Sequence, residues 1–225
     1  MTRQSTLRYK VHVTQHDDSH DDELTLEQSL ALIEGETRGV KRAFGIQVPI
    51  YYFVWGTAWL LGYLLLWAAW EGGPSPVTVP LAIAVPVFAA LILGAAVTSA
   101  VVGIRSNRGV KGPSDFVGTV YGISWSILGG AVAAIGYAMI NAGASNEAIS
   151  IYFTSAYALV VAAMYLAGAM LWHDVDLLVI AVIMAATAAI TGFFGAPGNM
   201  LGTALIAGCT LLVGGVIAVI RYRRM

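Results

Sequence analysis

The sequence is poor in charge. Only 11% of its 225 residues are charged and 58% are hydrophobic, whereas about 25% of the residues of soluble domains are charged. So much apolar side-chain surface cannot be hidden in one water-soluble core. We therefore predict an integral membrane protein.

The apolar stretches also lack charged side chains, apart from aspartates at helix starts such as Asp115 and Asp176. The single cysteine, Cys209, excludes an intrachain disulfide. The three lysines and four histidines lie outside these stretches, so a retinal Schiff base or an axial haem histidine has no donor there. Paired carboxylates and a serine–histidine dyad are missing from them too, which excludes the common intramembrane proteases. We predict no enzymatic activity and no cofactor.

Six segments are apolar and long enough to cross the membrane, which takes about 20 helical residues. They are Val48–Trp70, Val79–Gly103, Asp115–Ile140, Ala148–Leu171, Val175–Phe194 and Asn199–Ile220. The sequence predicts an all-α, polytopic fold of six transmembrane helices arranged as tandem helical hairpins. Residues 1–24 form a polar tail, 25–47 an amphipathic helix and linker, 48–220 the bundle and 221–225 a basic end.

Basic residues cluster on one side of the predicted topology. With six crossings, all of them fall at the same face, so the positive-inside bias puts both termini in the cytoplasm. There they would face anionic lipids of the inner leaflet. The predicted anchors are Arg38, Lys41, Arg42, Arg105, Arg108, Lys111, Arg221, Arg223 and Arg224.

This topology predicts which loops are accessible from outside the cell. A cysteine introduced at Ser75 or Ser145 should react with a membrane-impermeant thiol reagent added to intact cells, since both loops are predicted to lie outside. A cysteine at Ser106 should stay unlabelled until the cells are opened. Labelling at Ser106 from outside would contradict the topology.

The phrase RGVK occurs twice, at Arg38–Lys41 and at Arg108–Lys111, each before an odd-numbered span. Related phrases follow, VWGTAW at Val54–Trp59 and VYGISW at Val120–Trp125. Two matched phrases in the same order favour a duplicated hairpin, with Gly56 equivalent to Gly122 and Trp59 to Trp125. Gly118 and Gly122 also have the small-xxx-small spacing that lets membrane helices pack closely. A ligand signature is the alternative interpretation of RGVK.

Neutral polar side chains in the third and fourth spans are the candidate solute site. They are Tyr121, Ser124, Trp125, Asn141, Thr154 and Ser155. Together they could bind an uncharged or amphipathic solute by stacking and hydrogen bonding, toward the outer leaflet. The alternative is that the hydroxyls bond to their own helix, as Ser and Thr commonly do.

The tail holds two weaker signals. His12, His16 and His20 are spaced four apart among aspartates, which would align them on a helix as zinc or nickel ligands. The tract has no apolar face, which favours disorder and no metal site. From Thr25 to Ile33, a capping-box spacing and an apolar face predict a short surface helix that could dock a protein partner. Nucleic acid is not an expected partner.

The capped LALIEG helix, the basic linker, VWGTAWLLGY and RGVKGPS resemble uncharacterised actinobacterial six-span membrane proteins, some labelled only as transporters. The resemblance covers most of the chain from Leu26 and implies a bacterial plasma-membrane location, but no site residues. We predict a small, non-enzymatic membrane protein that transports or binds a solute. The alternative is a structural or regulatory subunit of a membrane complex.

Overall fold

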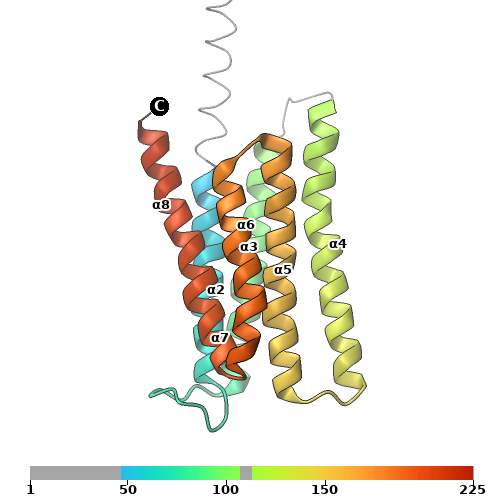
Figure 1. Cartoon of the computed structure of the whole chain (residues 1–225), viewed down its shortest axis with the longest axis vertical. Helices are drawn as coiled ribbons and strands as arrows, with labels where there is room; N and C mark the ends of the chain where they lie inside the picture. The colour runs from blue at the N-terminus through green and yellow to red at the C-terminus, as the bar shows by residue number, and fades with distance from the viewer. Residues whose placement is uncertain (1–46, 107–112, 225) are drawn as a thin grey trace, which may run out of the picture. The chain divides into compact units, whose positions relative to one another are not determined.

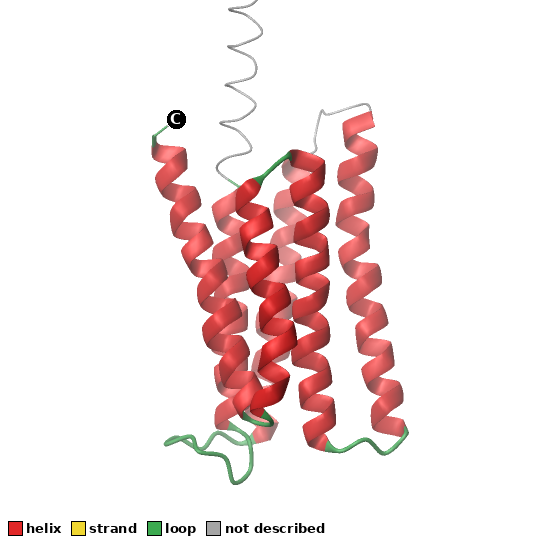
Figure 2. Ribbon diagram, in the orientation of Figure 1, coloured by secondary structure: helices red, strands yellow, loops and turns green. Residues whose placement is uncertain are grey.

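The computed structural model describes residues 47–106 and 113–224, all of which belong to one compact unit that begins at Lys41. Within these ranges the chain is helical and contains no strand (Figure 2). Six helices are long and apolar enough to cross a membrane. The predicted all-α fold is therefore confirmed. The polar tail, the amphipathic helix, both RGVK copies and the three tail histidines lie outside the described residues.

The first four spans are single helices. They are α2 (Val48–Ala68), α3 (Leu81–Ser106), α4 (Pro113–Asn141) and α5 (Asn146–Trp172). The fifth span is α6 (Val175–Ile190) extended by the 3₁₀ turn η1 (Thr191–Phe194). The sixth is α7 (Gly198–Thr203), the π-helical segment η2 (Ala204–Gly208) and α8 (Cys209–Arg223). The predicted spans match these helices to within a few residues at each end.

Local chemistry explains where several helices begin and end. Pro49 lies in the first turn of α2, where its missing N–H costs nothing. Ser145 caps α5 by accepting a hydrogen bond from the Ala148 amide at 3.2 Å. Asp174 caps α6 in the same way, and His173 ends α5 in the left-handed conformation at φ 52°. The tight turn between α5 and α6 thus needs only two residues.

The helices differ in how many neighbours they have. The fifth and sixth spans pack against the centre of the bundle, where α6 lies along α5 and the α7–η2–α8 span lies along α2 (Figure 1). By contrast, α3 packs mainly against α2, and α4 mainly against α5. Only 11% of the residues of each of these two spans are buried. Their exposed faces are apolar, as expected for contact with lipid.

The core lies where α2, α5, α6 and the sixth span meet. It combines large aromatic side chains from α2 with small alanines from the other helices, which lets the backbones come close. Its members are Tyr52, Trp59, Tyr63, Ala158, Ala162, Ile180, Met184, Met200, Ala204, Ala207 and Leu211.

Two glycines allow α2 and the sixth span to touch. A Cβ at Gly56 would lie 2.9 Å from the backbone nitrogen of Leu212, and one at Gly208 would lie 2.9 Å from the Cα of Leu60. On each helix the glycine is followed four residues later by a leucine, and each glycine contacts the leucine of the other helix. In the antiparallel pair this arrangement interlocks the two spans at two levels.

The predicted packing role of the third span's glycine is wrong within this chain. Gly122 is exposed, and a Cβ there would meet nothing within 4 Å. Its counterpart in the repeated phrase, Gly56, is buried against the sixth span. The tryptophans differ too, since Trp59 is buried in the core and Trp125 is only half-buried. Superposition of the two hairpins stays a prediction, but their matched residues have different surroundings.

Candidate functional site

The backbone is interrupted between the fifth and sixth spans. After η1 the chain passes through Gly195, at φ 63°, and a cis Ala196–Pro197 bond before α7 begins. Five residues of π-helix then separate α7 from α8. Segments of π-helix and broken helices are frequent at functional sites in membrane proteins. The interruption therefore marks the region to search.

A buried polar cluster lies beside the interruption. The Asn199 Nδ2 donates to Ser150 Oγ at 2.8 Å and to Thr154 Oγ1 at 3.0 Å. Ser150 Oγ donates in turn to Asn199 Oδ1 at 3.2 Å. All three side chains are buried, with Asn199 fully so. These bonds tie the start of α7 to the second and third turns of α5.

The hydroxyls of the neighbouring threonines hydrogen-bond to backbone carbonyls of their own spans. Thr187, Thr191 and Thr203 each donate to a carbonyl four residues earlier, at 2.8 Å. Among the described residues, every buried side-chain nitrogen and oxygen has a hydrogen-bond partner. The cluster is therefore closed, and we interpret it as a clamp that holds the broken helix. Nothing in it is left to bind a solute.

One open groove lies between α5 and α6, toward the end of the bundle that carries Glu147. Its volume is about 390 Å³. Alanines 185, 188 and 189 of α6 form one wall, and Tyr152, Ser155 and Leu159 of α5 form much of the other. Ser155 is its main polar group, so this groove suits an apolar chain better than a polar molecule.

A second groove lies between α6 and α8, on the other side of α6. Its volume is about 430 Å³, within the range of about 300–1,000 Å³ typical of ligand sites. Val48 and Tyr52 of α2 form its floor. The walls are Asp174, Asp176, Val179, Ile180 and Ile183 on one side and Leu205, Ile206, Cys209, Thr210, Val213, Gly214, Ile217 and Ala218 on the other. Because Val179 and Val213 are 52% and 56% exposed, the groove opens sideways to the surrounding lipid.

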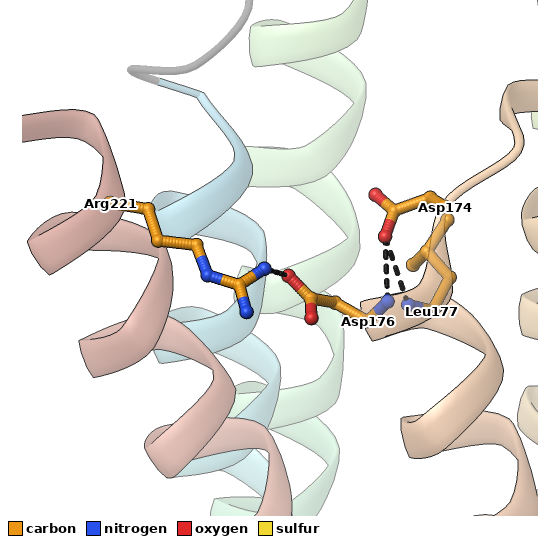
Figure 3. A network of polar contacts seen from close by, with 4 residues as sticks. All are labelled: Asp174, Asp176, Leu177 and Arg221. Carbon is orange, nitrogen blue, oxygen red and sulfur yellow. Dashed lines mark hydrogen bonds and ion pairs between the residues drawn. The ribbon is translucent and has the colours of Figure 1, made fainter. Parts of the chain in front are cut away.

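The mouth of this α6/α8 groove is charged. Arg221 reaches from α8 to form an ion pair with Asp176 of α6 (Figure 3). Beside it, Asp174 Oδ1 accepts from the Asp176 and Leu177 amides at 2.8 and 3.3 Å. Asp174 is therefore committed to the helix start, whose partial positive charge it balances. The Asp176–Arg221 pair is the exchangeable part of the mouth.

The six side chains predicted as a solute site do not form one site. Tyr121 and Trp125 pack edge to face on the N-terminal half of α4, and Trp125 also contacts Tyr165 of α5, at centroid distances of 6.1 and 5.9 Å. Asn141 is exposed at the far end of α4, about 24 Å of helix from Trp125. The cluster that sequence spacing suggested is therefore spread along the whole helix.

The remaining predicted side chains have other partners. The Tyr121 hydroxyl donates to the Met164 carbonyl at 3.1 Å, and Ser124 donates to the Val120 carbonyl of its own helix at 2.8 Å. Thr154 belongs to the buried clamp, and Ser155 lines the α5/α6 groove. The alternative stated for the hydroxyls, bonding to the backbone, thus holds for Ser124 and Thr154.

Sequence analysis missed the acidic side of the α6/α8 groove. Asp174 caps the start of α6, whereas Asp176 also forms an ion pair with Arg221. The signal was present in Arg221, because a basic residue closing the last span must lie at the same membrane face as the start of the fifth. Of the predicted basic anchors, Arg105, Arg221, Arg223 and Arg224 lie within the described residues, and all four are exposed.

The chain matches no protein-family model, and comparisons with curated proteins and with solved structures found no match either. Function is therefore inferred from the chain's own side chains.

Proposed function

We propose that this chain is a small, non-enzymatic membrane protein that binds an amphipathic solute in the α6/α8 groove, as the first step of carrying it. The observation that supports this is the division of the groove into an apolar length and a polar mouth. Apolar side chains line it from Leu205 to Ala218, and ionised groups stand only at the end near Asp176. An amphipathic molecule has the same division.

The interrupted sixth span supports movement as well as binding. The wall of the groove begins at Leu205 and Ile206, inside the π-helical segment. Single turns of π-helix inside an α-helix often accompany functional sites. A shift of α8 relative to α6 would widen the groove, while the clamp at Asn199 keeps α7 on α5.

The length of the groove agrees with the proposed topology. Leu205 to Ala218 covers about 20 Å of helix, and half of a bilayer's hydrocarbon core is about 15 Å thick. With both termini cytoplasmic, the mouth lies at the inner leaflet, among the basic residues that the positive-inside bias places there. The solute would enter sideways from that leaflet.

Filling the groove tests the proposal. Thr210→Trp puts a large ring in the wall of the groove, whereas Val216→Trp puts the same ring on the exposed face of α8 outside it. We expect native mass spectrometry of protein purified in mild detergent to find bound amphiphile on the wild type and on Val216→Trp. The occupancy of Thr210→Trp should be about tenfold lower than that of the wild type, because the ring excludes the ligand sterically. Equal occupancy of all three would contradict a site in this groove.

The alternative function, a structural or regulatory subunit, is favoured by the position of α4. This helix packs mainly against α5 and exposes most of its length. Purification from native membranes distinguishes the two functions: a stoichiometric protein partner would favour the subunit, and bound amphiphile without one would favour the carrier.

A further inference from the structure

The two sides of the mouth of the α6/α8 groove carry opposite charges. The α6 side carries Asp174 and Asp176, and the α8 side carries Arg221, with Arg223 and Arg224 exposed just beyond it. One rim is therefore negative and the other positive. The two rims meet in a single ion pair between Asp176 and Arg221.

That ion pair can exchange partners. The side chains of Arg221 and Asp176 are 58% and 42% exposed, and exposed pairs hold each other weakly because water competes for both charges. A ligand that carries one positive and one negative charge can take the place of this pair. Its positive group pairs with Asp176 and its negative group pairs with Arg221. The number of paired charges at the mouth is then unchanged.

The medium around the groove offers such a ligand. The groove opens sideways to lipid along the exposed side chains of Val179, Val213 and Ile217. Its length of about 20 Å is close to that of the acyl chain of one leaflet. A lipid that enters with its tail along this wall brings its head group to Asp176 and Arg221.

We propose that the α6/α8 groove selects a zwitterionic glycerophospholipid, with its ammonium on Asp176 and its phosphate on Arg221. This assignment rests on the proposed function, since it names the head group for the same groove. An anionic phospholipid would keep the phosphate contact but leave Asp176 without a counter-charge. Arg223 and Arg224 place further positive charge on the α8 rim, which fixes the orientation of the head group.

Competition between two lipids tests the head-group selection. Purified protein is given equal amounts of dioleoyl phosphatidylethanolamine and dioleoyl phosphatidylglycerol, and the bound lipids are counted by native mass spectrometry. We expect the wild type to retain the zwitterionic lipid about threefold to tenfold over the anionic one, as one or two partly exposed charge pairs allow. Equal retention would overturn the selection.

Charge variants should change the lipid preference in directions that the proposal predicts. In Asp176→Asn the ammonium loses its partner, so the preference should disappear or turn to the anionic lipid. In Arg221→Gln the phosphate contact is lost, so both lipids should bind less well. The double exchange Asp176→Arg/Arg221→Asp restores one charge of each sign and should recover part of the zwitterionic preference. An unchanged preference in Asp176→Asn would overturn the proposal.

Thr210→Trp separates a failure of the selection from a failure of the groove. If this variant loses both lipids while the wild type binds them equally, the groove is a lipid site without head-group selection. If the wild type and Thr210→Trp bind the same amounts, the groove is not the lipid site and the proposed function fails as well. Because the Asp176–Arg221 pair is largely exposed, its variants should keep the melting temperature of the wild type, which circular dichroism checks.

Discussion

Gly208→Ala should strongly destabilise the bundle. The new Cβ would lie 2.9 Å from the nitrogen, Cα and Cβ of Leu60, and two of these atoms belong to the backbone of α2, which cannot rotate away. Overpacking of this kind costs about 3 kcal/mol. Thermal unfolding in detergent, followed by circular dichroism, should therefore show a large drop in melting temperature.

The same substitution at the exposed glycine of α4 is the matched control. Gly122→Ala meets open space, and alanine is the better helix former by about 0.5–1 kcal/mol. The two variants should thus change stability in opposite directions. Similar losses in both would mean that α2 and the sixth span do not approach each other at Gly208.

Asn199→Asp should be the most damaging isosteric change. It removes the amide that donates to Ser150 and Thr154 and puts an acid in a fully buried position. An ionised carboxylate that is buried without a counter-charge is costly. The loss should therefore be largest at high pH, where the acid is ionised, and shrink at low pH, where it is neutral.

Asn141→Asp makes the same chemical change at an exposed residue at the end of α4. It should leave the melting temperature unchanged at every pH. Asn199→Leu keeps the number and branching of the side-chain heavy atoms without adding charge, so it should cost less than Asn199→Asp and show no pH dependence. A stable, pH-independent Asn199→Asp variant would mean that the clamp does not hold α7 to α5.

The number and limits of the spans could be predicted because they depend on local composition. Apolar runs, turn residues and a helix cap at Asp174 are all readable in sequence, and the structure agrees with them to within a few residues. The prediction did not extend to packing. Matched phrases placed Gly56 and Gly122 in equivalent sequence contexts, yet only Gly56 faces another helix, because α2 is central and α4 is peripheral.

The candidate site could be predicted only in part. Sequence analysis named two hydroxyls of the fourth span, and the structure places Thr154 in a buried cluster and Ser155 at a groove. It could not find Asn199 as the partner of Thr154, since the two residues are 45 positions apart and Asn199 looks like an ordinary helix-start residue. It also could not find the α6/α8 groove, which exists because α8 diverges from α6 beyond the π-helical segment. Such divergence depends on tertiary packing and leaves no periodic signal.

The most direct test of a ligand site in the α6/α8 groove uses the chain's only cysteine, because Cys209 lines that groove. The measurement is the rate at which N-ethylmaleimide alkylates Cys209 in mild detergent, as increasing amounts of dioleoyl phosphatidylethanolamine are added. A Cys209→Ser/Val216→Cys variant carries its thiol on the exposed face of α8 outside the groove and serves as the control. We predict that lipid slows alkylation of Cys209 about tenfold and in a saturable way, because a bound acyl chain covers the thiol, while the alkylation rate of the control variant hardly changes. Equal slowing in the wild type and the control, or none at Cys209, would contradict a ligand site between α6 and α8.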